Sequence, residues 1–254
     1  MYHRYFIQFA FDGTNYHGWQ YQPNAMSVQQ MLTEKMNMLF REEISLVGAG
    51  RTDTGVHATK YYAHFDSLRD DLGKDEEMLF KLNCILPRDI AAQRIKLMAQ
   101  DNAHARFGAI ARTYHYHIVR KKDAFAANRA WELKWRNLDA DLMNKGAALL
   151  LQYEDFSSFC KTGSDNNTNL CKVTESYWET EGDRMKFVIT ANRFLRNMIR
   201  ALVGTLVEVG RGKTSLDELK MIIETRNRSE AGTSAPACGL YLADVRYPKE
   251  YGLE

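Results

Sequence analysis

The spacing of apolar and polar residues predicts alternating strands and helices along the chain. Residues 3–11 form an apolar and aromatic run that ends in a turn-forming Asp-Gly-Thr-Asn, as expected of a strand. After Ser27, apolar residues recur at helical spacing, and Gln30 stands where a capping box would place it. We therefore expect a helix over residues 28–41.

The same pattern continues to the end of the chain. In residues 111–119 the alternation places Tyr114, Tyr116 and Ile118 on one face of a strand. The further predicted strands are residues 43–49, 60–66, 171–180, 184–191 and 239–247, and the further predicted helices are residues 75–83, 138–151, 154–160, 194–209 and 215–225. Hairpins are as frequent as crossovers, so we expect an α+β fold with a mostly antiparallel sheet.

The predicted helix at residues 194–209 is apolar almost all round, yet it carries Arg196 and Arg200 at the edge of its apolar surface. Near a helix N-terminus the dipole disfavours positive charge, so a guanidinium there needs a partner. The candidates are a carboxylate elsewhere in the fold or a phosphate of a bound ligand. Pairing with Glu208 or solvation at the surface is the alternative.

The loop GAGRTDTGVHA lies between two predicted strands and combines three glycines with a single carboxylate, Asp53. Loops of this kind commonly carry functional sites. It lacks the Gly-Lys-Ser/Thr ending of a phosphate-binding loop. The alternative is a structural turn in which Asp53 caps the backbone and Arg51 is solvated.

The overall composition, 254 residues with 45% hydrophobic and 26% charged residues, is typical of a soluble globular protein. The chain has no apolar run long enough for a membrane span and no signal-peptide pattern at its start, so we expect no membrane association and a cytoplasmic location.

Basic residues cluster locally although the net charge is only +2. Between Asp101 and Asp123 the chain has no acidic residue and five basic ones: Arg106, Arg112, Arg120, Lys121 and Lys122. Such a run is either a solvated face or a nucleic-acid surface. Tyr114 and Tyr116 follow Arg112 on one strand face, which suits stacking on a base beside phosphate-binding charge, although alternating aromatic residues are also typical of a core.

Neither a metal site nor a disulfide framework is predicted. The four cysteines, Cys84, Cys160, Cys171 and Cys238, are far apart and form no C-x-x-C pair. His115 and His117 share a strand face, but the sequence offers no third ligand. No partner can be named from the sequence for His57 or His104.

Several motifs, in their order along the chain, resemble the tRNA pseudouridine synthase A family. They are FDGTNYHGWQYQPNAMSVQQML, GAGRTDTGVHA, LNCILPRDI, HARFGAIARTYHY, EDFSSF, NRFLRNMIRALVGTLVEVGRGK and GLYLADVRYP. The resemblance covers nearly the whole chain. It departs at Phe11, where a Tyr is common, and at Ala201, where an Asn often follows the helix Arg.

The resemblance implies two RNA-recognition-like (ferredoxin-like) halves, residues 1–105 and 106–254, which share a central, mostly antiparallel sheet with a catalytic cleft between them. It implies a homodimer that isomerises uridine to pseudouridine in the anticodon arm of tRNA, at tRNA positions 38, 39 and 40, by base flipping and without cofactor or metal. No nucleotide-cofactor motif is present, in keeping with a redox-neutral rearrangement.

The resemblance also implies a role for individual residues. Asp53 would be the catalytic aspartate, with Arg51 helping to extrude the target nucleotide and Arg200 pairing with Asp53. Tyr114 would stack on the flipped uracil, and Leu240 would line its pocket. Arg112 and Arg196 complete the predicted substrate-binding set.

Two other functions fit parts of the sequence. A non-catalytic RNA-binding module would use the basic stretches and tyrosines without chemistry, but it would not need Asp53 with Arg51. A glycosidase-like hydrolase would normally need two carboxylates that flank the scissile bond, and only one can be named.

Overall fold

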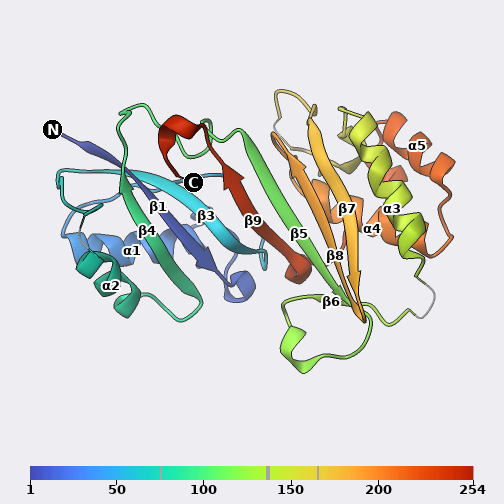
Figure 1. Cartoon of the computed structure of the whole chain (residues 1–254), viewed down its shortest axis with the longest axis horizontal. Coiled ribbons are helices and arrows are strands. Elements are labelled where there is room, and N and C mark those ends of the chain that lie inside the picture. The colour runs from blue at the N-terminus through green and yellow to red at the C-terminus, as the bar shows by residue number, and fades with distance from the viewer. Residues whose placement is uncertain (75, 136–137, 165, 254) are drawn as a thin grey trace. The chain divides into compact units, whose positions relative to one another are not determined.

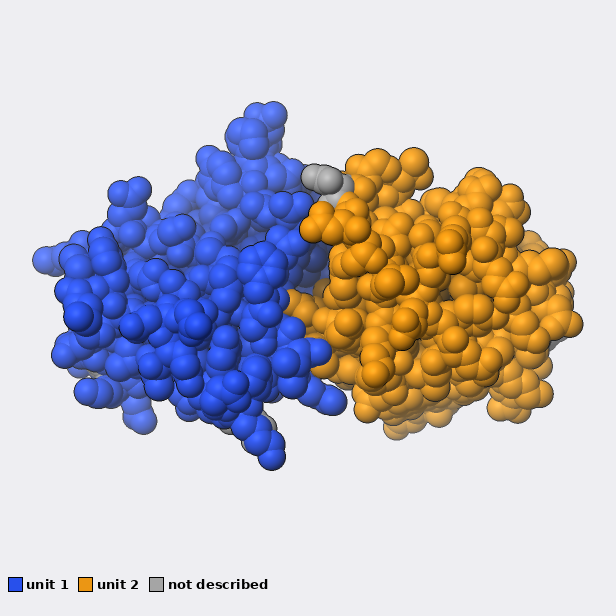
Figure 2. All heavy atoms as spheres, turned by 90° about the horizontal axis from the view of Figure 1, so that it is seen from above, with its two compact units in different colours: residues 1–110, 241–254 blue, residues 111–240 orange. Residues whose placement is uncertain are grey.

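The computed structural model describes residues 1–74, 76–135, 138–164 and 166–253. Contacts within the chain divide it into two compact units (Figure 2). The first comprises Met1–Ile110 with Tyr241–Glu254, and the second comprises Ala111–Leu240. Each unit combines helices with a sheet, so the predicted α+β class is confirmed.

The first unit has a sheet in the order β4-β1-β3-β9, with β2 also paired to β3 (Figure 1). Its elements are β1 (His3–Phe11), α1 (Val28–Phe40), β2 (Val47–Gly48), β3 (His57–Ser67), α2 (Glu76–Ile85), β4 (Ile90–Leu97) and β9 (Leu240–Arg246). The pairs of β1 with β3 and β4 are antiparallel, and β3 pairs with β9 in parallel. The last strand of the sequence therefore completes the sheet of the first unit.

The second unit has a sheet in the order β5-β8-β7, and the short β6 runs parallel to β5. Its elements are β5 (Ala111–Val119), β6 (Trp131–Glu132), α3 (Ala140–Leu149), β7 (Val173–Glu181), β8 (Arg184–Ala191), α4 (Met198–Gly210) and α5 (Leu216–Glu224). Both β5 and β7 pair antiparallel with β8. Helix α3 contacts β7 and packs against α4 and α5 (Figure 1).

Helix α1 begins where the sequence predicts, because the Ser27 hydroxyl oxygen accepts the Gln30 N–H at 3.2 Å. The predicted capping box is wrong in its second half. The Gln30 side chain donates to Glu34 at 2.9 Å, one helical turn further on, and does not reach back to Ser27.

Helix α4 begins at Met198, four residues later than predicted. The preceding residue, Asn197, has φ of 64°, so the chain is not helical there, and its side-chain amide donates to Ser234 at 2.6 Å. Arg196 consequently lies before the helix, while Arg200 lies in its first turn. The helix is buried nearly all round, as its apolar pattern predicts, because every α4 residue except Arg200 and Glu208 is buried.

Two predicted elements are reduced to two or three residues in the structure. The strand expected at residues 43–49 is reduced to β2, since the Ile44 N–H donates to the Asn37 side chain at the end of α1 and not to a neighbouring strand. The helix expected at 154–160 is a single turn, Ser157–Phe159. The predicted start of α2, Asp75, lies outside the described residues.

Among the described residues, no helix has both the length and the apolar character needed to cross a membrane.

Candidate functional site

Asp53 lies in the loop of residues 49–56, called here the Asp53 loop, which joins β2 to β3. The loop starts against an aromatic core: Trp19 stacks on Tyr61 with ring centroids 4.6 Å apart. The Tyr61 hydroxyl donates to the Gly50 carbonyl and also accepts the Gly50 N–H. The first residues of the loop are thereby attached to the buried face of β3.

The loop ends in a tight turn that opens at Asp53. The Val56 N–H donates to the Asp53 carbonyl at 3.2 Å, and Gly55 adopts φ of 77° within the turn. Asp53 is half-buried, whereas Arg51, two residues earlier, is exposed and donates to Gln20 at 2.9 Å. The two residues predicted for chemistry are thus presented by one short loop.

Residues 12–19, called here the 12–19 segment, pack directly on this loop. A Cβ at Gly13 would lie 1.9 Å from the Val56 carbonyl oxygen, and a Cβ at Gly18 would lie 2.3 Å from the Thr52 oxygen. The Gly55 N–H donates to the Tyr16 carbonyl at 3.3 Å. Only glycine allows the two backbones to approach this closely, so the FDGTNYHGW motif forms the back of the Asp53 loop.

Asp89, from the LNCILPRDI motif, anchors the 12–19 segment through two hydrogen bonds. Its carboxylate accepts the Tyr16 hydroxyl at 2.7 Å, and its carbonyl accepts the Asp12 N–H at 2.8 Å. Burial and the neighbouring Asp89 raise the pKa of Tyr16, which keeps its hydroxyl protonated as a donor. Two motifs far apart in the sequence therefore support the same loop.

In the second unit the predicted alternation along β5 is confirmed, with Tyr114, Tyr116 and Ile118 buried. The Tyr114 ring meets Phe194 edge to face, with centroids 5.2 Å apart. Tyr116 is a core residue whose hydroxyl donates to the Pro236 carbonyl at 2.7 Å, and burial raises its pKa. Of the two tyrosines, Tyr114 is the one beside the chain that leads into α4.

Residues 231–239, called here the 231–239 segment, connect several predicted site residues within the second unit. The Arg200 side chain donates from Nε to the Ala235 carbonyl at 2.7 Å, and the Ala235 N–H donates back to the Arg200 carbonyl at 2.9 Å. A Cβ at Gly239 would lie 2.7 Å from the Tyr116 ring. Leu240, 6% exposed, follows at once.

Sequence reasoning missed the role of this segment, because its contacts with Arg200 and Tyr116 are made by main-chain groups. The only signals are its glycines, Gly232 and Gly239, which allow close approach to α4 and β5. The predicted partner of Arg200 was a carboxylate or a phosphate. Within the second unit its Nε is held by a carbonyl, and its pairing with Asp53 stays a prediction.

The remaining two predicted residues lie at the ends of the strands of the second unit. Arg112, near the start of β5, donates to the Asn192 carbonyl at 3.0 Å. Arg196 is exposed in the loop after β8, and its carbonyl accepts the Lys161 N–H at 3.0 Å. Arg112 is therefore attached to the same loop that carries Arg196.

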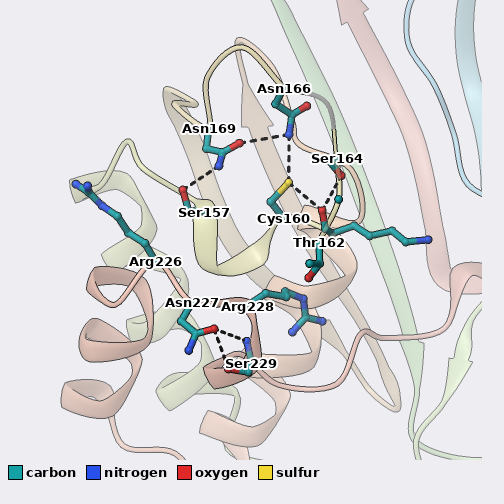
Figure 3. Close-up of a pocket in the computed structure, with 12 residues that line it drawn as sticks. Ser157, Cys160, Thr162, Ser164, Asn166, Asn169, Arg226, Asn227, Arg228 and Ser229 are labelled. Atoms are coloured by element: carbon teal, nitrogen blue, oxygen red, sulfur yellow. Dashed lines mark hydrogen bonds between the residues drawn. The ribbon is translucent and has the colours of Figure 1, made fainter.

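A polar hollow of about 610 Å³ lies elsewhere in the second unit, and no predicted site residue lines it (Figure 3). The two arginines that line it, Arg226 and Arg228, do not point toward a common centre. Arg226 forms an ion pair with Asp155, while Arg228 donates to the carbonyls of Ala231 and Gly232, and their side chains point in different directions (Figure 3). These arginines support the surrounding loops.

No group of three or more His, Cys, Asp or Glu side chains in the described part of the chain is placed to hold a metal ion.

Comparison with known proteins covers nearly the full length. A tRNA pseudouridine synthase A from Bacteroides fragilis is 48% identical over 249 residues, which are 97% of each chain. The chain belongs to the tRNA pseudouridine synthase A family. A family member from Porphyromonas gingivalis is also 48% identical, over 97% of this chain and 98% of its own. One from Thermoanaerobacter pseudethanolicus is 39% identical, over 95% of this chain and 98% of its own.

The model of the family described as tRNA pseudouridine synthase matches residues 147–248. This region contains α4, the 231–239 segment and the whole of β9. The resemblance to the tRNA pseudouridine synthase A family is thus confirmed.

Proposed function

We propose that this protein converts uridine to pseudouridine in the anticodon stem-loop of tRNA, at tRNA positions 38, 39 and 40, with Asp53 as the catalytic residue. The relatives that match over 97% of the chain are named for tRNA pseudouridine synthesis. The observation that carries the proposal is the Asp53 loop, a half-buried carboxylate beside an exposed arginine on a turn that is held from both ends.

The reaction rearranges atoms that the substrate already contains. The bond from ribose C1′ to uracil N1 breaks, the base turns, and C1′ bonds to C5, which loses its proton while N1 gains one. No electron acceptor or further group is needed, so we propose no cofactor and no metal. The enzyme must flip the base out of its stack, position a carboxylate beside it and enclose it in a pocket.

Each remaining residue has a proposed role. Arg51, exposed two residues before Asp53, helps to extrude the nucleotide, and Arg200 orients the Asp53 carboxylate. Tyr114 stacks on the uracil and Leu240 lines its pocket. Arg112 and Arg196 bind phosphates of the tRNA, which positions the RNA without reading its sequence.

The proposed assembly rests on the family resemblance, and the proposed location is the one expected from the sequence pattern. We propose a cytoplasmic homodimer that binds each tRNA across both subunits. Light scattering during gel filtration would measure the mass directly, and a mass of a single chain at micromolar concentration would contradict the dimer.

The proposed activity is tested by tritium release from an unmodified tRNA transcript labelled at C5 of uridine. The native protein should release tritium, and Asp53→Asn should lower the rate on the order of a thousandfold or more while it still binds tRNA. Asp217→Asn, an exposed carboxylate on α5, is the matched control and should keep the native rate.

Two outcomes would replace the proposal. If the native protein binds tRNA without releasing tritium, it is a binding module. Free uracil in the reaction mixture would instead indicate a hydrolase, because an isomerase retains the base.

A further inference from the structure

His57 is a buried histidine at the first position of β3, four residues after Asp53. It is 1% exposed, and its ring stacks on Tyr241 of β9 with centroids 4.5 Å apart. Its Nδ1 accepts the Gly13 N–H at 3.0 Å. Because an amide can only donate, Nδ1 carries the lone pair in this contact, and the neutral ring has its proton on Nε2.

This hydrogen bond connects the 12–19 segment to the end of the Asp53 turn. Gly13 presses against Val56 so closely that a Cβ would lie 1.9 Å from the Val56 oxygen. At the other end of the segment, the Trp19 N–H donates to the Thr52 carbonyl at 3.4 Å. Thr52, just before the Asp53 turn, and Val56, at its end, are thus held by one segment, and His57 supplies its side-chain anchor.

Asp12 lies next to this anchor, with Oδ1 3.1 Å from Nδ1 of His57. The same carboxylate oxygen accepts both the N–H and the hydroxyl of Thr14. The Asp12 carboxylate therefore receives hydrogen bonds from Thr14 and does not depend on a proton from Nδ1 of His57.

We propose that His57 is a positioning residue for Asp53, which it fixes by accepting the Gly13 N–H. The inference rests on the proposed function, in which Asp53 is the catalytic group. His57 touches neither the substrate nor the reacting atoms. Its effect is on the direction of a carboxylate four residues away, and a displacement of about 1 Å at a catalytic group can lower a rate about a hundredfold.

The chain offers a matched control on the same strand. His64 is also buried on β3, at 5% exposure, and its Nδ1 accepts a backbone N–H, that of Ala105, at the same 3.0 Å. Replacing either histidine by leucine removes the same kind of hydrogen bond from the first unit. Only His57 is joined to the Asp53 loop, so only its loss should affect the reaction.

The test compares His57→Leu, His57→Asn and His64→Leu in the full chain by steady-state tritium release. We expect His57→Leu to lower kcat about ten- to a hundredfold with KM for tRNA within about twofold. His57→Asn places its Oδ1 where Nδ1 stood and should recover most of kcat. Both leucine variants should lower the melting temperature by a few degrees, but His64→Leu should leave kcat native.

A second readout needs no activity. Deuterium uptake of a peptide over residues 48–57 should rise in His57→Leu and not in His64→Leu, because only the first releases the loop. Native kcat with unchanged uptake in His57→Leu would overturn the positioning role, as would an equal loss of kcat in His64→Leu. A native protein that releases no tritium would instead contradict the proposed function, and the uptake would still decide whether His57 holds the loop.

Discussion

His64 shows how burial determines the charge of a single residue. Its ring lies beside His104, with centroids 4.5 Å apart, and within reach of the positive field of Arg4. Burial first, and then these neighbours, lower the pKa of His64 from 6.5 to about 4. The folded protein therefore holds His64 neutral, whereas the unfolded chain protonates it below about pH 6.5.

This difference predicts a loss of stability in acid. Between pH 6.5 and about 4 the unfolded state binds one more proton at His64, so the free energy of unfolding falls as pH falls, by roughly 1 kcal/mol per pH unit. His64→Asn keeps an acceptor for the Ala105 N–H but does not titrate. Urea unfolding at pH 7 and pH 4.5 should show that the free energy of unfolding falls more for the native protein than for His64→Asn. Equal falls in the two proteins would contradict the low pKa.

Gly18 allows a prediction about close packing behind Asp53. Its φ is 81°, and an alanine Cβ there would lie 2.3 Å from the Thr52 oxygen. Gly182 also has a positive φ, 56°, but open space around it. Both alanine variants should lose about 1 kcal/mol from backbone strain.

Only Gly18→Ala should also lower kcat, because it displaces the backbone next to Asp53. Denaturant unfolding together with tritium release separates the two effects. Equal activities in Gly18→Ala and Gly182→Ala would show that the 12–19 segment does not position Asp53.

The sequence reveals this site only in part. Glycines around a single carboxylate, together with the family motifs, were enough to select the Asp53 loop. The partner of His57 was not predictable, because Gly13 is 44 residues away and contributes a main-chain N–H that leaves no trace in side-chain chemistry. Carbonyl partners such as Ala235 are hidden from sequence reasoning for the same reason.

At the scale of elements, α4 and the 231–239 segment form one support for Arg200. A Cβ at Gly204, one turn after Arg200, would lie 1.9 Å from the Thr233 carbonyl oxygen. The Gly232 N–H donates to Thr205 at 3.0 Å. The apolar pattern predicts the helix, but not its start, because the backbone of Asn197 is set by its contact with Ser234 across the same interface.

Gly204→Ala should therefore separate the segment from α4. The rigid carbonyl of Thr233 has to move, so we expect a loss of about 1–3 kcal/mol in unfolding free energy together with a lower kcat through Arg200. Gly210→Ala, at the other end of α4, would meet the flexible Met143 side chain and should be milder on both counts. Similar effects of the two variants would argue against a special role for this contact.

At the scale of the whole molecule, the last residues of the chain, 241–254, belong to the first unit. His57 of β3 pairs with Tyr241 of β9, and the Tyr247 hydroxyl donates to the Ala105 carbonyl at 2.7 Å. Strand β9 was predicted from its local pattern, but its parallel partner was not, since a pairing between residues so far apart in sequence depends on the assembled fold. The pairing of His57 with Tyr241 thus holds β9 in the sheet of the first unit.

The formal charge of the whole chain, +2, gives no strong attraction to RNA, so binding of tRNA must depend on local basic residues. Arg196 is exposed and belongs to the proposed phosphate-binding set, whereas the exposed Arg226 is paired with Asp155. If Arg196 contacts one phosphate, Arg196→Gln should weaken tRNA binding and reduce the slope of log affinity against log salt by about 1, with kcat unchanged at saturating tRNA. Arg226→Gln removes the same charge and should leave the slope native. Filter binding at several salt concentrations measures both, and a native slope in Arg196→Gln would remove that residue from the tRNA contact surface.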